Sequence, residues 1–412
     1  MIGNDLLPLS IPFLATIGLA ILGYFLARMR ALKISQGDIR ALNALPHQHG
    51  LNSALSTLMP PMAAMLLWAL IARIAGRNDV SLVPSNPTFV YIVLIGLAVA
   101  GLVLSLMKIS PDFRARNASE RWIMGLLIFA STIAILTTVG IVLSMVSETF
   151  NFFGQYEWKD FYFSTEWAPN FRGDSDLGIL PLLWGTMYIS FIALLFAVPI
   201  GLFAAIYLSE YASARLRSVA KPMIEILAGI PTIVYGLFAL ITVGPLLRDY
   251  FAAPMGLGQS ASSVMTAGLV MGIMLIPFVS SLSDDIINAV PQAMRDGSLG
   301  LGATKSETIR QVVVPAALPG IVGAVLLAAS RGIGETMIVV LGAGAAARLS
   351  LNPFEAMTTV TVKIVSQLTG DTDFGSPETL VAFALGLTLF VITLGLNVLA
   401  LYIVRKYREQ YE

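Results

Sequence analysis

The chain alternates between long apolar stretches and short segments that hold most of its charged residues. A helix needs about 20 mostly apolar residues to cross a bilayer. The pattern therefore predicts an all-α, polytopic membrane protein with nine spans. They are expected at residues 6–27, 54–74, 89–107, 122–146, 177–208, 223–247, 264–282, 320–342 and 380–404.

Composition agrees with this interpretation and excludes several function classes. Hydrophobic residues make up 56% of the chain and charged residues 12%, against about 25% charged in a soluble domain. The net charge is zero, so no basic field for nucleic acid is expected. The absence of cysteine excludes disulfides, thiolate chemistry and Cys-ligated zinc. His47 and His49 are the only histidines and are predicted to lie in a cytoplasmic loop without other ligands, so we expect no metal or cofactor.

Lys and Arg concentrate in alternate loops, at 28–40, 108–121, 215–221, 295–310 and 405–408. Because basic loops stay on the cytoplasmic side, these loops are predicted to be cytoplasmic. Nine spans then place the amino terminus outside and the carboxyl terminus inside. The first apolar stretch has no basic residue before it, so it is expected to be a retained helix and not a cleaved signal peptide.

The polar segment at about 283–318 holds the most informative local pattern. Thr304 and Glu307 match a capping box, which predicts the start of a short helix, and Pro315 is expected to end it. Gly302 permits a sharp bend. A short, half-apolar helix between two spans suits a groove on a soluble partner. The alternative is an interfacial helix lying on lipid.

A second cluster, from Ser330 to Thr336, places charges inside the eighth predicted span. If that span is one helix, Arg331 lies near its centre and Glu335 one turn further out on the same face. Such charges cost about 2.5–3.5 kcal/mol each on insertion scales and usually face protein or a water-filled path. The pair could be self-neutralised and purely structural. It could also be an anion station in which Arg331 binds the anion and Glu335 offsets its charge.

Other features of the apolar pattern are less specific. Small residues on the eighth span predict close contact with another helix; they are Gly320, Ala324, Ala328 and Gly332. Glu225, Asp284 and Asp285 are expected to be interfacial charges. The aromatic external segment at 148–176 is either an interfacial belt or part of a docking surface.

The passage from Asp296 to Pro315 resembles the coupling-loop signature of ABC importer permeases, in which Glu-Ala-Ala precedes a Gly and then Ile-x-Leu-Pro at fixed spacing. Asp296-Gly-Ser stands for Glu-Ala-Ala, Gly302 is in place, and Val312-x-Val-Pro keeps the spacing. The resemblance implies contact with an ATPase subunit. The residues implied are Asp296, Gly297, Ser298, Gly302, Ala303, Thr304, Glu307, Val312 and Pro315.

The passage Ser330–Met337 resembles the Arg-x-x-Gly-Glu-Thr motif of phosphate-specific permeases. Met337 and the stretch 228–237 favour the PstC-type subunit over its PstA-type partner. The resemblance covers roughly residues 122–404 and implies a type I ABC importer fold with a core of six helices. It predicts a permease domain at 122–412 and an extension with three spans at 1–121.

This resemblance implies the permease subunit of an ATP-driven inorganic phosphate importer in a bacterial cell membrane. Its implied partners are a PstA-like second permease, a pair of cytoplasmic ATP-binding subunits and an extracytoplasmic phosphate-binding protein. The implied substrate path includes Ser330, Arg331, Glu335 and Thr336. The chain is not expected to be an enzyme, because the stretch before Lys305 lacks the glycine and the strand of a phosphate loop.

Two other function classes stay open at this point. One is a permease for another oxyanion, such as molybdate or sulfate. The other is an ion-coupled secondary transporter, which would be expected to show inverted repeats and carboxylates at mid-membrane.

Overall fold

The computed structural model describes residues 7–36, 40, 42–77, 87–170, 175–370 and 375–408. These residues are helical apart from turns, loops and one antiparallel pair of two-residue strands, β1 (Trp167–Ala168) and β2 (Asp176–Leu177). Eight of the described helices are long and apolar enough to cross a membrane. The prediction of an all-α, polytopic membrane protein is therefore confirmed.

The chain divides into two compact units, Met1–Val139 and Gly140–Glu412, which we describe separately. Their boundary falls inside helix α4 (Ala115–Phe153). The predicted functional boundary at residue 121 stays a prediction, because compactness alone does not define a permease domain.

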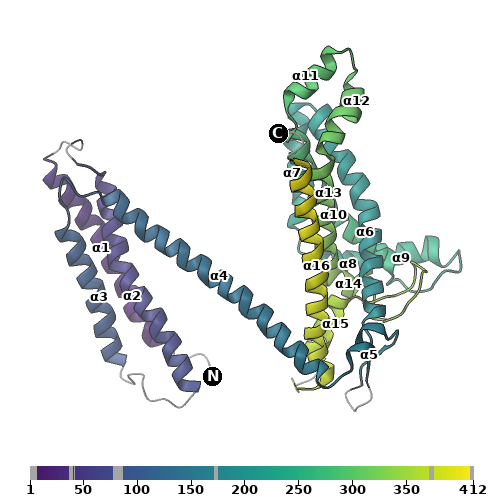
Figure 1. The fold of residues 1–412 in the computed structure, drawn as a ribbon, viewed down its shortest axis with the longest axis horizontal. Helices are drawn as coiled ribbons and strands as arrows, with labels where there is room; N and C mark the ends of the chain where they lie inside the picture. Colours follow the sequence, from purple (N-terminus) through teal and green to yellow (C-terminus); the bar gives the residue numbers. More distant parts are fainter. Residues whose placement is uncertain are drawn as a thin grey trace. The chain divides into compact units, whose positions relative to one another are not determined.

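Unit 1 contains α1 (Leu7–Ile34), α2 (Pro46–Arg77), α3 (Pro87–Met107) and the first part of α4 (Figure 1). The first three helices pack against one another. A side chain at Gly101 of α3 would collide with the backbone carbonyl of Ser56 in α2, so glycine permits these helices to touch at the backbone. The second expected span lies within the 32 residues of α2 but is not among the eight, and it stays a prediction.

The two histidines are an exception to the sequence interpretation of unit 1. His47 and His49 belong to the first turn of α2 and not to a loop. His49 is buried beside the Phe113 ring, at 6.0 Å between ring centroids. Burial lowers the pKa of its imidazole.

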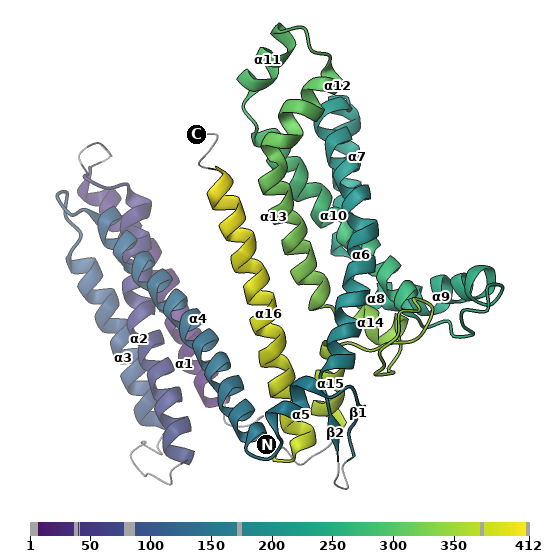
Figure 2. The same cartoon turned by 45° about the vertical axis from the view of Figure 1, so that its right-hand side comes forward.

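Unit 2 begins within α4 and is built around the parallel contact of two long helices, α6 and α10 (Figure 2). The main helix contacts to this pair come from α7, α8, α13, α14 and α15. The helices after α4 are α5 (Trp158–Phe163), α6 (Leu180–Ile206), α7 (Ala214–Gly229), α8 (Thr232–Phe238), α9 (Gly244–Leu247), α10 (Val264–Ala289), α11 (Gln292–Gly300), α12 (Lys305–Thr308), α13 (Val314–Ile333), α14 (Met337–Gly342), α15 (Val360–Gly370) and α16 (Pro377–Arg408). Four π-helical turns lie between them, η2 (Tyr207–Tyr211), η3 (Ala239–Val243), η4 (Arg248–Ala252) and η5 (Ile309–Val313).

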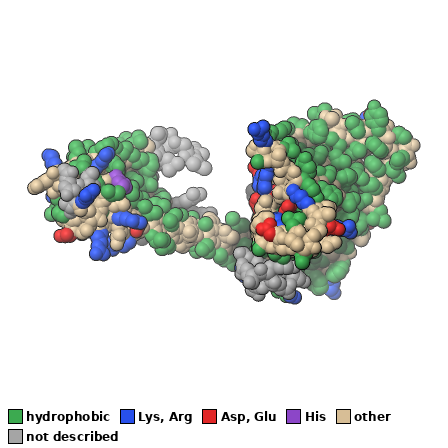
Figure 3. Space-filling model, turned by 90° about the horizontal axis from the view of Figure 1, so that it is seen from above, with side chains coloured by type: hydrophobic (Ala, Val, Ile, Leu, Met, Phe, Trp, Pro, Cys, Tyr) green, Lys and Arg blue, Asp and Glu red, His purple; other side chains and the backbone are tan. Residues whose placement is uncertain are grey.

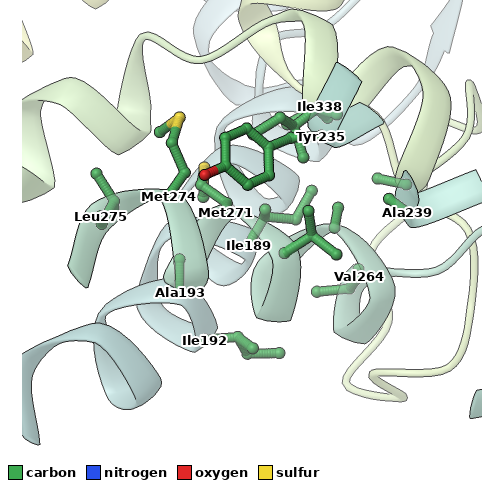
Figure 4. Close-up of a cluster of buried hydrophobic side chains, with 14 of the residues drawn as sticks. Ile189, Ile192, Ala193, Tyr235, Ala239, Val264, Met271, Met274, Leu275 and Ile338 are labelled. Atoms are coloured by element: carbon green, nitrogen blue, oxygen red, sulfur yellow. The ribbon is translucent and has the colours of Figure 1, made fainter. Parts of the chain in front are cut away.

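The main core of unit 2 lies where α6 and α10 meet α8 and α14 (Figure 4). Ile189 and Ala193 of α6 face Met271 and Leu275 of α10, and Tyr235 of α8 closes the cluster. The small-residue tract of α13 packs on α10 as expected. A side chain at Gly320 would lie 2.6 Å from Ile286, which is too close for the two helices to keep their separation.

Two predicted spans are interrupted. The sixth breaks at Ile230–Pro231, because α7 ends at Gly229 and α8 begins at Thr232. Proline has no N–H to donate, so the break forms there, and the Tyr235 hydroxyl donates across it to the Leu227 carbonyl at 2.8 Å. The eighth breaks after Ile333. Pro277, in contrast, lies inside an unbroken α10.

The aromatic segment at 148–176 is partly a core. Phe152 and Phe161 are fully buried and stack edge-on, whereas Trp158 and Phe163 are exposed. Hydrophobic side chains also cover much of the visible surface in Figure 3, while charged side chains form smaller patches. An apolar surface of this extent is typical of a protein that faces lipid.

Candidate functional site

The predicted Arg331–Glu335 pair does not share one helix. Helix α13 ends at Ile333, and α14 begins at Met337. The Glu335 carboxylate accepts hydrogen bonds from the backbone N–H groups of Met337 and Ile338, at 3.1 and 3.5 Å. It thereby satisfies donors that a new helix leaves free. The expectation of a same-face pair is wrong because α13 ends before Glu335, whose carboxylate caps the start of α14 instead.

The break is also held from outside its own segment. The Thr361 hydroxyl donates to the Glu335 carbonyl at 2.9 Å, and Thr361 lies in α15. Backbone groups released by a broken helix must find partners in an apolar environment. The contact from α15 supplies one of those partners.

Arg331 lies in the last turn of α13, and its side chain is exposed. Its guanidinium carbon lies 4.2 Å from the centre of the Phe278 ring, which is a cation–π contact. Within the described ranges, no carboxylate forms an ion pair with it. The carbonyl end of a helix favours a cation. In the part of the chain that the structure describes, the N–H donors of Arg331 therefore make no ion pair with a carboxylate, and the side chain is held by the Phe278 ring.

Ser330 and Thr336 lie on either side of this break and are partly exposed. Thr336 occupies the N-cap position of α14, but its hydroxyl makes no capping hydrogen bond. The structure thus places all four predicted path residues within one short segment. It does not pair the two charges.

The second predicted site is the hairpin of α11 and α12. The capping box is confirmed: the Thr304 hydroxyl accepts from the Glu307 N–H at 3.3 Å, and the Glu307 carboxylate accepts from the Thr304 N–H at 2.8 Å. At the turn, Gly302 has a φ of +88°. The N–H groups of Gly302 and Ala303 donate back to the carbonyls of Leu299 and Ser298. This is a Schellman motif, and its left-handed position requires glycine.

Pro315 does not end the short helix, contrary to the prediction. The π-helical turn η5 joins α12 to α13, and the Val314 N–H donates to the Ile309 carbonyl. Pro315 then occupies the first turn of α13, where its missing N–H costs little. Lys305–Ile333 is consequently one helix of 29 residues. It connects the capping box to the turn that carries Arg331.

The apolar side of this helix packs against other helices of the same chain. Ile309 and Val313 are buried, and Val313 packs with Ile287 and Ile321. The surface left for a partner is instead the turn of the hairpin, where Leu301 is 91% exposed and Leu299 is exposed as well.

The predicted contact residues of the hairpin divide by exposure. Asp296, Gly297, Gly302, Thr304 and Glu307 are exposed, whereas Ser298, Ala303 and Val312 are partly covered. Pro315 is exposed at the start of α13. The Ser298 and Thr308 hydroxyls bond at 2.9 Å and tie the two arms together.

Sequence analysis missed the ionic contacts that support the base of the hairpin. Arg295 bonds Glu210 at 2.9 Å. Asp284, expected to be interfacial, is only 2% exposed and bonds Arg217 and Lys221 at 2.9 and 2.8 Å. The hydrogen bond to Asp284 raises the pKa of the Lys221 ammonium. The four-residue spacing of the two cations on α7 is the local signal that could have indicated a shared partner.

Comparisons with known proteins agree with the predicted family. The family described as binding-protein-dependent transport system inner membrane component matches residues 197–409. A second family, described as phosphate ATP-binding cassette transporter, matches residues 13–83.

Relatives match over most of their own lengths. The phosphate transport system permease protein PstC of Mesorhizobium japonicum is 31% identical, over 67% of this chain and 87% of the relative. PstC 1 of Mycobacterium tuberculosis is 35% identical, over 60% and 81%. The probable ABC transporter permease YqgH of Bacillus subtilis is 33% identical, over 57% and 74%. The chain therefore belongs to the binding-protein-dependent transport system inner membrane component family and, within it, to the PstC-type permeases.

Proposed function

We propose that this chain is the membrane-spanning permease subunit of an ATP-driven inorganic phosphate importer. The observation that carries the proposal is the unpaired, exposed Arg331 at the end of a helix that begins in the coupling hairpin. The phosphate transport named for the PstC relatives supports the choice of anion. Molybdate and sulfate permeases are the less favoured alternative.

Arg331 is the proposed anion station. A guanidinium stays charged and offers a flat fork of donors that suits phosphate oxygens. The hydroxyls of Ser330 and Thr336 add neutral donors on either side of it. Glu335 has a different role from the one first expected: it holds the start of α14 and so fixes the shape of the break.

The helix Lys305–Ile333 gives a direct route from ATP hydrolysis to the anion. At 1.5 Å per residue, its 29 residues span about 40 Å. A movement imposed on the hairpin at Leu301 and Gly302 would tilt this helix as a unit. Arg331, at the far end of the helix, would then become accessible first from one side of the membrane and then from the other.

The remaining assignments follow from this function. ATP hydrolysis belongs to separate cytoplasmic subunits that receive the hairpin. A PstA-like second permease supplies the other half of the path, and an extracytoplasmic binding protein delivers phosphate. The amino terminus lies outside and the carboxyl terminus inside the bacterial cell membrane, with residues 1–121 as an added module before the permease domain.

The test is to purify the chain with its co-encoded partners, reconstitute the complex, and measure ATP hydrolysis with binding protein loaded with phosphate, sulfate or molybdate. Phosphate-loaded binding protein is expected to stimulate hydrolysis most strongly, with phosphate carried inward. Stimulation by sulfate or molybdate, but not by phosphate, would assign a different oxyanion. No stimulation by any loaded binding protein would contradict the importer function.

A further inference from the structure

Unit 1 contains a pocket that the proposed import function does not use. Its volume is about 520 Å³, and it lies between α2, α3 and the start of α4. All of its lining residues belong to unit 1, so the pocket is complete within that unit.

The charged residues that line the pocket are all positive. Lys108 and Arg121 line it, and none of its lining residues is acidic. Lys108 has no ion pair in the described ranges, and the Arg121 Nε only approaches the Asn117 carbonyl, at 3.4 Å. Lys and Arg side chains gather on this end of unit 1 (Figure 3). Two cations with no acidic residue in the lining create a positive potential that favours an anion.

The pocket is also lined by polar residues that are almost fully buried. Asn52 is 5% exposed and lines the pocket, and no described residue hydrogen-bonds its side-chain amide. Its amide atoms are not among the fully buried polar atoms without a partner, so they open onto the space of the pocket. Ser56 adds a hydroxyl to the lining, whereas the Ser105 hydroxyl already donates to the Leu102 carbonyl at 2.8 Å. A side chain that is held this firmly and opens onto the pocket, with no hydrogen bond from a described residue, is the second, independent sign of a ligand.

The lining also includes apolar and aromatic side chains, among them Leu104, Phe113 and Trp122. A ligand that fits would carry a negative charge next to Lys108 and Arg121. It would also accept hydrogen bonds from hydroxyl and amide groups. A phosphate group has both properties, because its oxygens are strong acceptors for Arg, Lys and amide donors.

We infer that this pocket binds a phosphate group through Lys108, Arg121 and the buried amide of Asn52. The group has two possible sources with the same chemistry: the headgroup of an anionic lipid, or free phosphate. This site is separate from Arg331 and gives unit 1 a ligand of its own.

The experiment uses the full chain purified in detergent and native mass spectrometry with two probes. One probe is dioleoylphosphatidylglycerol, with dioleoylphosphatidylcholine as the reference lipid, and the other is inorganic phosphate. The pocket variants are Lys108→Gln with Arg121→Gln, and Asn52→Leu. The matched control is Arg30→Gln with Arg114→Gln, which removes the same charge from exposed positions of unit 1 that do not line the pocket.

We expect both pocket variants to weaken binding about tenfold, as lost charge-assisted hydrogen bonds should, while the control stays within about twofold of the unchanged chain. This pattern with phosphatidylglycerol identifies a lipid headgroup, and the same pattern with inorganic phosphate identifies the free anion. If Asn52→Leu fails to fold, Ser56→Ala replaces it. Equal binding by pocket and control variants for both probes overturns the proposal. So does a loss confined to the charge variants, because surface attraction alone would explain it.

Discussion

The hairpin of α11 and α12 and the break between α13 and α14 are two interruptions with similar residues and different origins. Each contains a glycine and a glutamate that binds backbone N–H groups. At the hairpin, the hydrogen bonds that shape the turn come from within a few residues of Gly302. At the break, Thr361 and Phe278 come from α15 and α10. The turn of the hairpin is therefore shaped by local contacts, whereas the break is shaped by contacts with residues distant in the chain.

The largest expected effect separates the two glycines. Gly302 has a φ of +88°, whereas Gly334 has a φ of −83° and ordinary space around it. A side chain in the left-handed region costs about 1–2 kcal/mol per residue, more for a β-branched one. Gly302→Val is expected to reduce phosphate uptake about tenfold or more at normal expression, while Gly334→Ala stays near normal.

The measurement for this pair is uptake together with ATP hydrolysis in the assembled complex. Loss of uptake with continued hydrolysis in Gly302→Val would show uncoupling at the hairpin. Normal uptake by Gly302→Val would mean that the left-handed turn is dispensable.

A smaller effect is expected at Glu335. Removing a helix cap costs about 1 kcal/mol, so Glu335→Ala should lower the free energy of unfolding of the purified chain by about that amount. Glu335→Gln keeps a carbonyl oxygen that can accept from the Met337 N–H, and its thermal midpoint should stay close to that of the unchanged chain. Equal destabilisation by both variants would show that the carboxylate charge, and not the cap, holds the break.

The smallest effect concerns Phe278. Its ring orients Arg331 through a cation–π contact, which is worth about 0.5–1 kcal/mol at an exposed site. Phe278→Leu is expected to raise the KM for phosphate-loaded binding protein about two- to fivefold, and Phe278→Tyr should restore it because the ring is kept. A Tyr variant as impaired as the Leu variant would argue that packing matters and not the ring.

The difference between the two regions also explains what the sequence could predict. The capping box at Thr304 and the bend at Gly302 were predictable because capping and backbone conformation are local. The break after Ile333 was not predictable. An apolar run of this length predicts one span, whether or not a threonine distant in the chain hydrogen-bonds to its backbone. The burial of Asp284 was missed for the same reason: its partners lie 67 and 63 residues away in the chain.

Long apolar stretches predicted the long helices of both units, but they did not predict where those helices begin and end. The first helix continues to Ile34, past Arg28 and Arg30, and α4 extends beyond the predicted span at both ends. Hydropathy identifies where a chain prefers lipid and does not show where its backbone hydrogen bonds stop. Pro231 and Pro315 illustrate the limit, since one separates two helices and the other lies inside a continuing one.

The central claim is that Arg331, at the end of the helix Lys305–Ile333, binds the transported anion. Its most direct test is Arg331→Gln in proteoliposomes that contain the complete complex, with Arg248→Gln as the matched control, because Arg248 pairs with the adjacent Asp249. Radiolabelled phosphate uptake and ATP hydrolysis are measured in the same preparation. The account predicts that Arg331→Gln assembles and hydrolyses ATP but carries no phosphate, while Arg248→Gln transports normally. Phosphate uptake by Arg331→Gln at the rate of the unchanged complex would contradict it.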